Sequence, residues 1–390
     1  MTSEQKYFIQ ILSDHLAGRE SCPPEDVVDW EEIVSAAKKH DLAGIVWHQC
    51  HKLSPLAEAL YGHCRNSLYN YGRRVKTEEI IKTAFRNSGI ESFVVKGSAI
   101  ATYYPVPAYR TMGDTDFVVR GNDFEQAHNC LITLGFVCRN VLEQKERIYC
   151  KKDFFVELHH GLYYSENMKT GKNPEFFNTC WEHIRDGYPE RSFHTVYLLD
   201  HLRKHLVFRG AGFRQFMDIA VLTKNCNEKD WAFIESKLIE LGLRDFSSRV
   251  FAINEKWFGV APPIECTPSD DAFYEEVTSN IYLNGVFGFN NSENDSGENV
   301  IAARNSKHKK LGMLRRALHF FFPTYDNMKR NPPFAFVKGR PYLLPVAWVY
   351  RIFRSLFLKQ ATKGIQTAKK SFISDEEYAK REEWLKSWRL

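Results

Sequence analysis

The spacing of apolar residues predicts helices at the start of the chain. Phe8, Leu12 and Leu16 recur at four-residue intervals, which places them on one face of a helix. A longer stretch with helical spacing covers residues 67–87 and ends before a glycine. We therefore expect residues 1–88 to form an N-terminal helical segment.

After residue 89 the apolar residues form the short runs that are typical of strands. Strands are expected over 92–95, 115–120, 147–150 and 154–159. The last two flank the turn Lys151-Lys152-Asp153 and should form a hairpin. Helical stretches are expected from Gly97 to near Pro105 and over 121–134.

The remainder of the chain returns to helical spacing. Helices are expected over 195–208, 213–225, 229–241, 243–258 and 270–283. A polar loop at 289–300 indicates a boundary. Beyond it we expect a basic helix near 308–321, a proline-rich bend over 323–345 and a helix over 346–370. The fold class is therefore α+β, with a small mixed sheet between N- and C-terminal helical segments.

Composition favours a globular protein of a reducing compartment. Hydrophobic residues make up 44% of the chain, enough for sizeable cores. The nine cysteines are odd in number and no two have C-x-x-C spacing, which argues against a disulfide framework or a zinc site. The N-terminus lacks a signal-peptide pattern, and no apolar run has the length of a membrane span. We therefore expect a cytoplasmic location and no transmembrane segment.

The chemistry is concentrated around one strand with two acidic residues. Asp114 and Asp116 are two apart, so they lie on the same face of the strand. Two neighbouring carboxylates repel each other unless a cation lies between them, and Mg²⁺ prefers such oxygen ligands. Gly97-Ser98 follows a strand and begins a helix, a position where backbone N–H groups can bind phosphate. Glu157, on the later strand, is the candidate for a third carboxylate of a two-metal site.

These motifs resemble the bacterial "uncharacterised nucleotidyltransferase" family of the DNA polymerase β-like superfamily. The resemblance rests on Lys96-Gly97-Ser98, Tyr104-Pro105, Arg110-Thr111-Met112-Gly113-Asp114-Thr115-Asp116, Gly135-Phe136 and Glu157-Leu158-His159, and continues in His205, Arg214 and Asp218. It implies domains at 1–88 (helical), 89–165 (nucleotidyltransferase core), 166–288 (helices lining the cleft) and 301–390 (basic, helical). The interval between Ser98 and Asp114 is longer than in typical superfamily members.

The resemblance also implies roles for single residues. Asp114, Asp116 and Glu157 would be the catalytic metal ligands, for Mg²⁺ or Mn²⁺. Lys96, Gly97, Ser98 and Arg110 would bind the nucleotide. His159, His205, Arg214 and Asp218 would line the cleft.

Each of these positions also has a purely structural interpretation. His159 is more often a structural histidine than a ligand, and the one-turn spacing of His201 and His205 favours helix packing over metal binding. Arg214 and Asp218, one turn apart, are expected to pair with each other on their helix. Arg110 could pair with Asp114 in place of phosphate.

The resulting expectation is an enzyme that moves an NMP from an NTP to a hydroxyl or phosphate acceptor. The resemblance makes a glycan, lipid-linked or peptide acceptor plausible. One alternative is a toxin–antitoxin enzyme that nucleotidylates protein or RNA, against which the length of 390 residues argues. Another is a nucleotide-binding scaffold without turnover. The sequence identifies neither the acceptor nor the base.

The charge is distributed unevenly along the chain. The net charge is +5, yet residues 301–390 carry 20 Lys and Arg against 6 Asp and Glu, a balance of +14. Such a segment favours an anionic ligand. Its apolar residues around Val346, Val349 and Phe353 could pack on the core, which we favour, or lie on an anionic membrane. An inert basic surface is the third interpretation.

Overall fold

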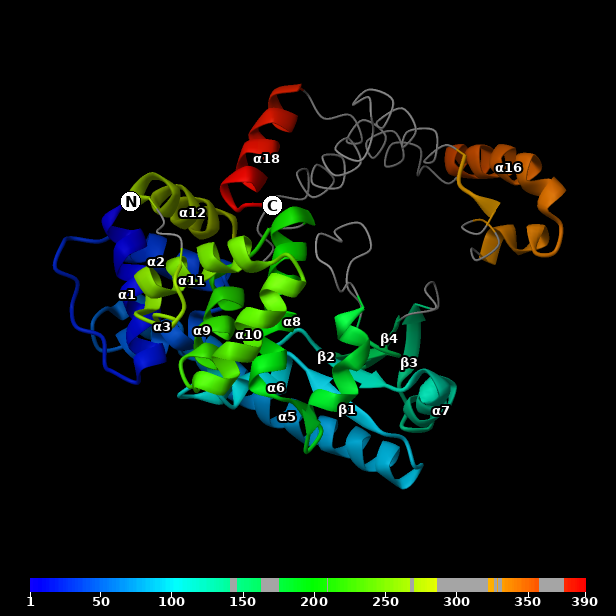
Figure 1. Ribbon diagram of the computed structural model, residues 1–390, viewed down its shortest axis with the longest axis horizontal. Helices are drawn as coiled ribbons and strands as arrows, with labels where there is room; N and C mark the ends of the chain where they lie inside the picture. Colours follow the sequence, from blue (N-terminus) through cyan, green and yellow to red (C-terminus); the bar gives the residue numbers. More distant parts are fainter. Residues whose placement is uncertain are drawn as a thin grey trace. The chain divides into compact units, whose positions relative to one another are not determined.

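The computed structural model describes residues 1–140, 146–162, 175–208, 210–266, 270–285, 322–325, 328, 332–357 and 375–390. The chain divides into two compact units, and Figure 1 shows their helices and strands coloured along the sequence. The first comprises Met1–Leu206 and Gly210–Gly288, and the second is mainly Phe289–Trp388. The division into four segments that the sequence suggests stays a prediction.

The first unit is built around a five-stranded mixed sheet. The strands are β1 (Ser92–Val95), β2 (Asp114–Val119), β3 (Val137–Asn140), β4 (Glu146–Lys151) and β5 (Phe154–His159). Their order across the sheet is β1-β2-β5-β4-β3, and only β2 and β5 run parallel among these pairs. This arrangement confirms the α+β fold class and the small mixed sheet.

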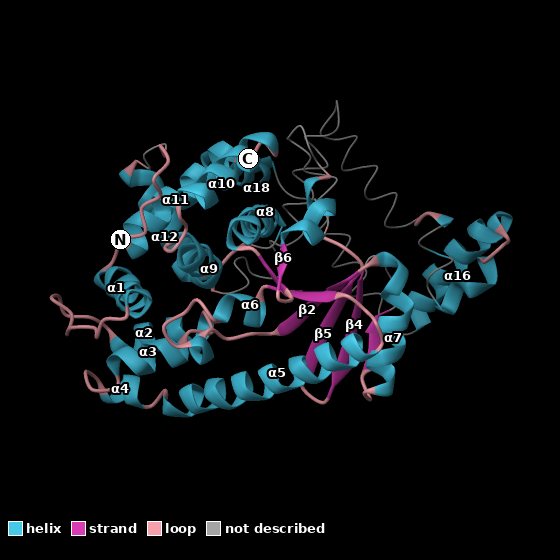
Figure 2. Cartoon of the chain, turned by 60° about the horizontal axis from the view of Figure 1, so that its bottom comes forward, coloured by secondary structure: helices cyan, strands magenta, loops and turns pink. Residues whose placement is uncertain are grey.

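One face of the sheet forms the hydrophobic core. Phe117 and Val119 of β2 alternate with the acidic positions and are fully buried with Val156 and Leu158 of β5. This face packs on α5 (Tyr61–Asn87) and α7 (Phe124–Thr133), and Figure 2 shows α5 running alongside the sheet. The opposite face is therefore left for Asp116 and Glu157.

Helices before and after the sheet complete the first unit. They are α1 (Ser3–Ala17), α2 (Trp30–Lys39), α3 (Ala43–Cys50), α4 (Pro55–Glu58), α6 (Gly97–Ala101), α8 (Arg191–Phe208), α9 (Phe213–Thr223), α10 (Glu228–Glu240), α11 (Arg244–Phe258) and α12 (Asp271–Asn284). The first helix begins with a capping box between Thr2 and Gln5 and ends at Gly18 in the left-handed conformation. The two-stranded ribbon of β6 (Ile184–Arg185) and β7 (Tyr188–Pro189) precedes α8.

Several predicted elements differ from the structure. The helix expected from Gly97 to near Pro105 ends at Ala101, four residues before the proline. The sequence pattern does not predict the strand β3, and α8 begins four residues earlier than expected. The helix expected over 346–370 is observed as α16 (Leu344–Phe357). Residues 289–300, 308–321 and 358–370 lie outside the described part of the chain.

The second unit contains α16, α18 (Asp375–Ser387) and two short 3-10 helices, Pro332–Val337 and Pro341–Leu343, within the predicted proline-rich bend. A small core joins Met328, Phe334, Val337 and Ala347. Among the described helices of both units, none combines the length and the apolar character required to cross a bilayer.

Candidate functional site

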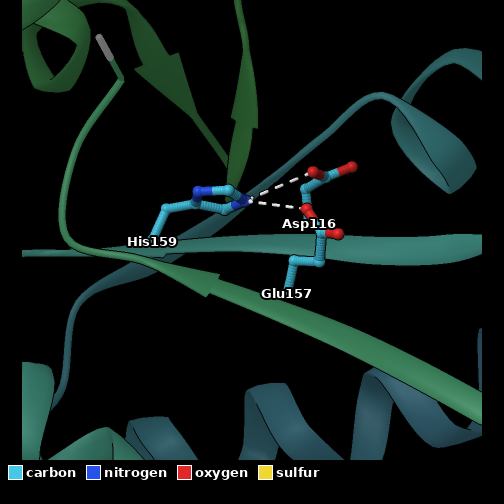
Figure 3. A group of neighbouring side chains, drawn as sticks. All are labelled: Asp116, Glu157 and His159. Carbon is cyan, nitrogen blue, oxygen red and sulfur yellow. Dashed lines mark hydrogen bonds and ion pairs between the residues drawn. The ribbon is translucent and has the colours of Figure 1, made fainter. Parts of the chain in front are cut away.

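The polar face of the sheet brings two carboxylates and an imidazole together. Asp116 of β2 lies directly opposite Glu157 of the parallel strand β5, and His159 is two residues further along β5. One ligand atom from each of the three lies within 4.8 Å of the others (Figure 3). Nε2 of His159 is 3.3 Å from Oδ1 of Asp116 and 3.5 Å from Oε2 of Glu157. We call these three residues the Asp116 cluster.

Asp114 stands beside the Asp116 cluster at the exposed start of β2. The alternation of the strand puts it on the same face as Asp116, as the sequence predicts. Desolvation, followed by the nearby carboxylates of Asp116 and Glu157, raises the pKa of the Asp114 carboxyl. In the described residues, however, the compact three-donor group contains His159 in place of the predicted ligand Asp114.

Lys96 supplies the positive charge next to these acids. Its Nζ lies 3.1 Å from Oδ1 of Asp116, and its side chain is 23% exposed. Burial would lower the pKa of this ammonium, but Asp116, Tyr197, Asp114 and Glu157 together outweigh burial and the pKa is raised. Its backbone has φ 58° and ψ −146°, a conformation that side-chain-bearing residues rarely adopt. Gly97 follows with φ 39°, so the chain turns sharply between β1 and α6.

The charges in the site compensate one another. Burial would raise the pKa of the Asp116 carboxyl, but the Lys96 ammonium and the contact with His159 hold it below its ordinary value. Burial would also lower the pKa of His159, but its hydrogen bonds to Asp116 and Glu157 raise it to about 9. The carboxylates of the site are thus balanced by the Lys96 ammonium and the His159 imidazolium. A bound divalent cation could balance the same negative charge.

The donor set fits a divalent metal ion. Two carboxylate oxygens suit Mg²⁺ and Mn²⁺, and an imidazole nitrogen is a better ligand for Mn²⁺ than for Mg²⁺. Asp116 and Glu157 belong to adjacent strands, so the sheet itself fixes the spacing of their carboxylates.

Comparison with known proteins adds an independent finding. A family model described as uncharacterised nucleotidyltransferase matches residues 26–259, well over half of the chain. The chain belongs to this family. The match contains the sheet, Lys96, the Asp116 cluster and α9, and the family assignment supports NMP transfer as the general reaction. No curated protein matches the chain.

The two residues expected to hold the triphosphate of this nucleotidyltransferase, Gly97 and Ser98, are buried. Ser98 is buried, and its hydroxyl donates a hydrogen bond to the buried carboxylate of Glu78 on α5. Glu78 also lies 2.7 Å from Nζ of Lys82. The side chain of Ser98 therefore ties α6 to α5. Phosphate binding by Gly97 and Ser98 stays a prediction.

Arg110 and Asp218 form a buried ion pair between the loop that leads to β2 and α9. Nε and Nη2 of Arg110 donate to the two carboxylate oxygens of Asp218 at 2.8 and 2.7 Å. The hydroxyl of Tyr104 donates to the same carboxylate at 2.7 Å. The predicted pairing of Asp218 with Arg214 is therefore wrong, because the better-placed guanidinium of Arg110 takes its oxygens. A phosphate contact by Arg110 stays a prediction.

Arg214 instead holds the same loop from another side. Its Nη1 donates to the backbone oxygen of Thr111 at 2.9 Å and lies 3.6 Å from Oδ2 of Asp41. The aromatic rings of His201 and His205, one turn apart on α8, lie 4.4 Å apart at an angle of 64°, and their role in helix packing stays a prediction. The cleft-lining roles of Arg214, Asp218 and His205 stay predictions.

Two residues near the site had no signal in the sequence. Arg74 on α5 donates to the backbone oxygen of Gly113 at 2.9 Å, directly before Asp114. His194 on α8 accepts a hydrogen bond from the backbone N–H of Lys96 at 3.3 Å. Both contacts join residues distant in sequence, so periodicity could not have revealed them.

Proposed function

We propose that this nucleotidyltransferase moves an NMP from an NTP to an acceptor hydroxyl or phosphate at the Asp116 cluster. The observation that carries the proposal is the register of β2 and β5, which places Asp116 opposite Glu157 with Lys96 at hydrogen-bonding distance. Family membership supports the class of reaction, and the cluster supports its place in the fold.

The metal ligands in this proposal are Asp116, Glu157 and His159, with Asp114 completing the acidic site. When Mg²⁺ or Mn²⁺ is bound, it neutralises phosphate charge and lowers the pKa of the acceptor hydroxyl. A cation on Asp116 would also free the Lys96 ammonium to contact a phosphate oxygen. We therefore assign Lys96 to the triphosphate.

In the transfer, the acceptor oxygen forms a bond to the α-phosphorus. The bond from that phosphorus to its bridging oxygen breaks, and pyrophosphate leaves with the electron pair. The proton of an acceptor hydroxyl has to pass to a base. We assign this proton to Asp114, because it lies next to the cluster on the same face of β2 and the pKa of its carboxyl is raised.

The test is release of pyrophosphate and transfer of label from an α-labelled NTP, in the presence of Mg²⁺ or Mn²⁺. Acceptors should include glycan, lipid-linked, peptide, protein and RNA fractions. We expect Asp116→Asn and Glu157→Gln to abolish transfer with the fold retained. Glu125→Gln is the matched control, since this carboxylate lies on α7, is 69% exposed and pairs with Arg147.

The outcomes of this assay distinguish the proposed reaction from the two alternatives. Label on the protein or RNA fraction would favour the nucleotidylating enzyme known from toxin–antitoxin systems. Nucleotide binding without release of pyrophosphate, for every acceptor and both metals, would favour a scaffold and contradict the proposal. Equal activity in Asp116→Asn and the unmodified chain would place the reaction elsewhere.

A further inference from the structure

The helix α16 of the second unit, orange in Figure 1, has an exposed apolar stripe. The stripe consists of Val346, Val349, Tyr350 and Phe353, which are 55%, 54%, 45% and 56% exposed. Their spacing of three, four and seven residues puts them on one side of the helix. We call these four residues the α16 stripe.

The core of the unit lies mainly against another side of the helix than the α16 stripe. That core uses Ala347, with Trp348 packed against it, and contacts Phe334 and Val337. The indole N–H of Trp348 donates to the backbone oxygen of Pro323 at 2.8 Å, which fixes the orientation of the helix. The helix is therefore apolar on two sides. Of the stripe, Tyr350 meets this core, with its ring 5.9 Å from that of Phe334, whereas Val346, Val349 and Phe353 are each more than half exposed.

The sequence around the stripe carries charge of one sign only. Between positions 327 and 374 there are ten Lys and Arg residues and no Asp or Glu. Within the described span 332–357 these include Lys338, Arg340, Arg351 and Arg354. An exposed apolar stripe in a basic segment suits a lipid surface, which has anionic headgroups and an apolar interior.

In place of the packing on the core that the sequence favours, we propose that the α16 stripe docks on an anionic lipid surface, with α16 lying in the plane of the interface. The helix has 14 residues. It is thus about 21 Å long, shorter than the roughly 30 Å of a hydrocarbon core. Phosphates of a nucleic acid would match the positive charge but would leave Val346, Val349 and Phe353 in water. Lipid satisfies both features, and the proposal does not depend on the proposed reaction.

The experiment is co-sedimentation of the full chain with two kinds of vesicle, one of phosphatidylcholine alone and one containing roughly one-third phosphatidylglycerol. We expect pelleting with the anionic vesicles only, weakened by salt. The double variant Val349→Glu, Phe353→Glu should lower the apparent affinity at least about tenfold, because it removes buried apolar area and adds repulsion.

The matched control is Val27→Glu, Ile239→Glu. It makes the same charge change at apolar positions of the first unit that are 97% and 61% exposed. We expect this variant to bind vesicles as the unmodified chain does. Both pairs are exposed, so thermal unfolding of the two variants should match that of the unmodified chain.

Three results would overturn the proposal. The first is absence of pelleting with anionic vesicles at low salt. The second is equal binding by the stripe variant and the unmodified chain, which would leave charge alone as the cause. The third is equal loss of binding in the control variant, which would make the effect one of net charge.

Discussion

The backbone N–H of Lys96 donates a hydrogen bond to Nε2 of His194, with 3.3 Å between the nitrogens. This bond holds a residue whose φ of 58° is costly for any side chain larger than glycine. His194 is 1% exposed, and burial lowers its pKa to about 3, so the ring stays neutral and can accept. Helix α8 thereby fixes the backbone of the lysine that touches Asp116.

Removing the acceptor at position 194 should impair turnover more than nucleotide binding. In His194→Phe the N–H of Lys96 loses its partner, at a cost of about 1–3 kcal/mol, and the ammonium shifts relative to Asp116. We expect kcat to fall about tenfold with a smaller change in KM. His194→Gln, whose amide oxygen can accept, should recover part of kcat. Equal kcat in both variants, at matched thermal stability, would contradict a positioning role.

Lys96→Met should have opposite effects on metal binding and on catalysis. The ammonium occupies Oδ1 of Asp116, so its removal should tighten Mn²⁺ binding without nucleotide by several-fold. Transfer should nevertheless fall about 10²-fold, because a positive charge next to the phosphates is lost. Calorimetry and pyrophosphate release measure the two effects. Lys96→Arg is the control that keeps the charge, and weaker Mn²⁺ binding in Lys96→Met would contradict this account.

Replacing only one partner of the Arg110–Asp218 ion pair should lower the stability of the fold. Loss of one partner leaves a buried charge without compensation, which typically costs about 3–5 kcal/mol. We expect Asp218→Leu to lower the free energy of unfolding in urea by such an amount. The double variant Arg110→Met, Asp218→Leu should regain much of it. A double variant as unstable as the sum of the single variants would show that the two residues act independently.

Buried His40 should make stability depend on pH between about 6.5 and 4. Burial lowers the pKa of His40 to about 4, while the unfolded chain has the ordinary value near 6.5. Between these two pH values the unfolded state binds more protons than the folded state. The free energy of unfolding is therefore highest above this window and falls by roughly 3 kcal/mol as the pH is lowered through it. His40→Gln cannot take up this proton. The difference in unfolding free energy between the two proteins should therefore change with pH, and a constant difference would refute the prediction.

The sequence predicted those parts of the site that depend on local pattern. The alternation in β2 put Asp114 and Asp116 on one face, and the alternation in β5 put Glu157 and His159 together. Hydrophobic periodicity likewise predicted most of the helices. These features need only the neighbours of a residue along the chain.

What the sequence could not supply are contacts between distant residues. Ser98 offers a hydroxyl that suits a phosphate, but its partner Glu78 comes from α5. Asp218 has an arginine one turn away, yet it binds Arg110, 108 positions earlier. The choice between two partners depends on geometry that appears only when the elements pack.

The parallel pairing of β2 and β5 also determines where the chain could accept inserted residues. Because Asp116 and Glu157 meet through strand register, a one-residue deletion within β5 would turn Glu157 to the hydrophobic face. The two residues between β4 and β5, Lys152 and Asp153, lie outside that register. An epitope or a small reporter domain inserted there would lengthen the hairpin loop and leave the spacing of the carboxylates unchanged.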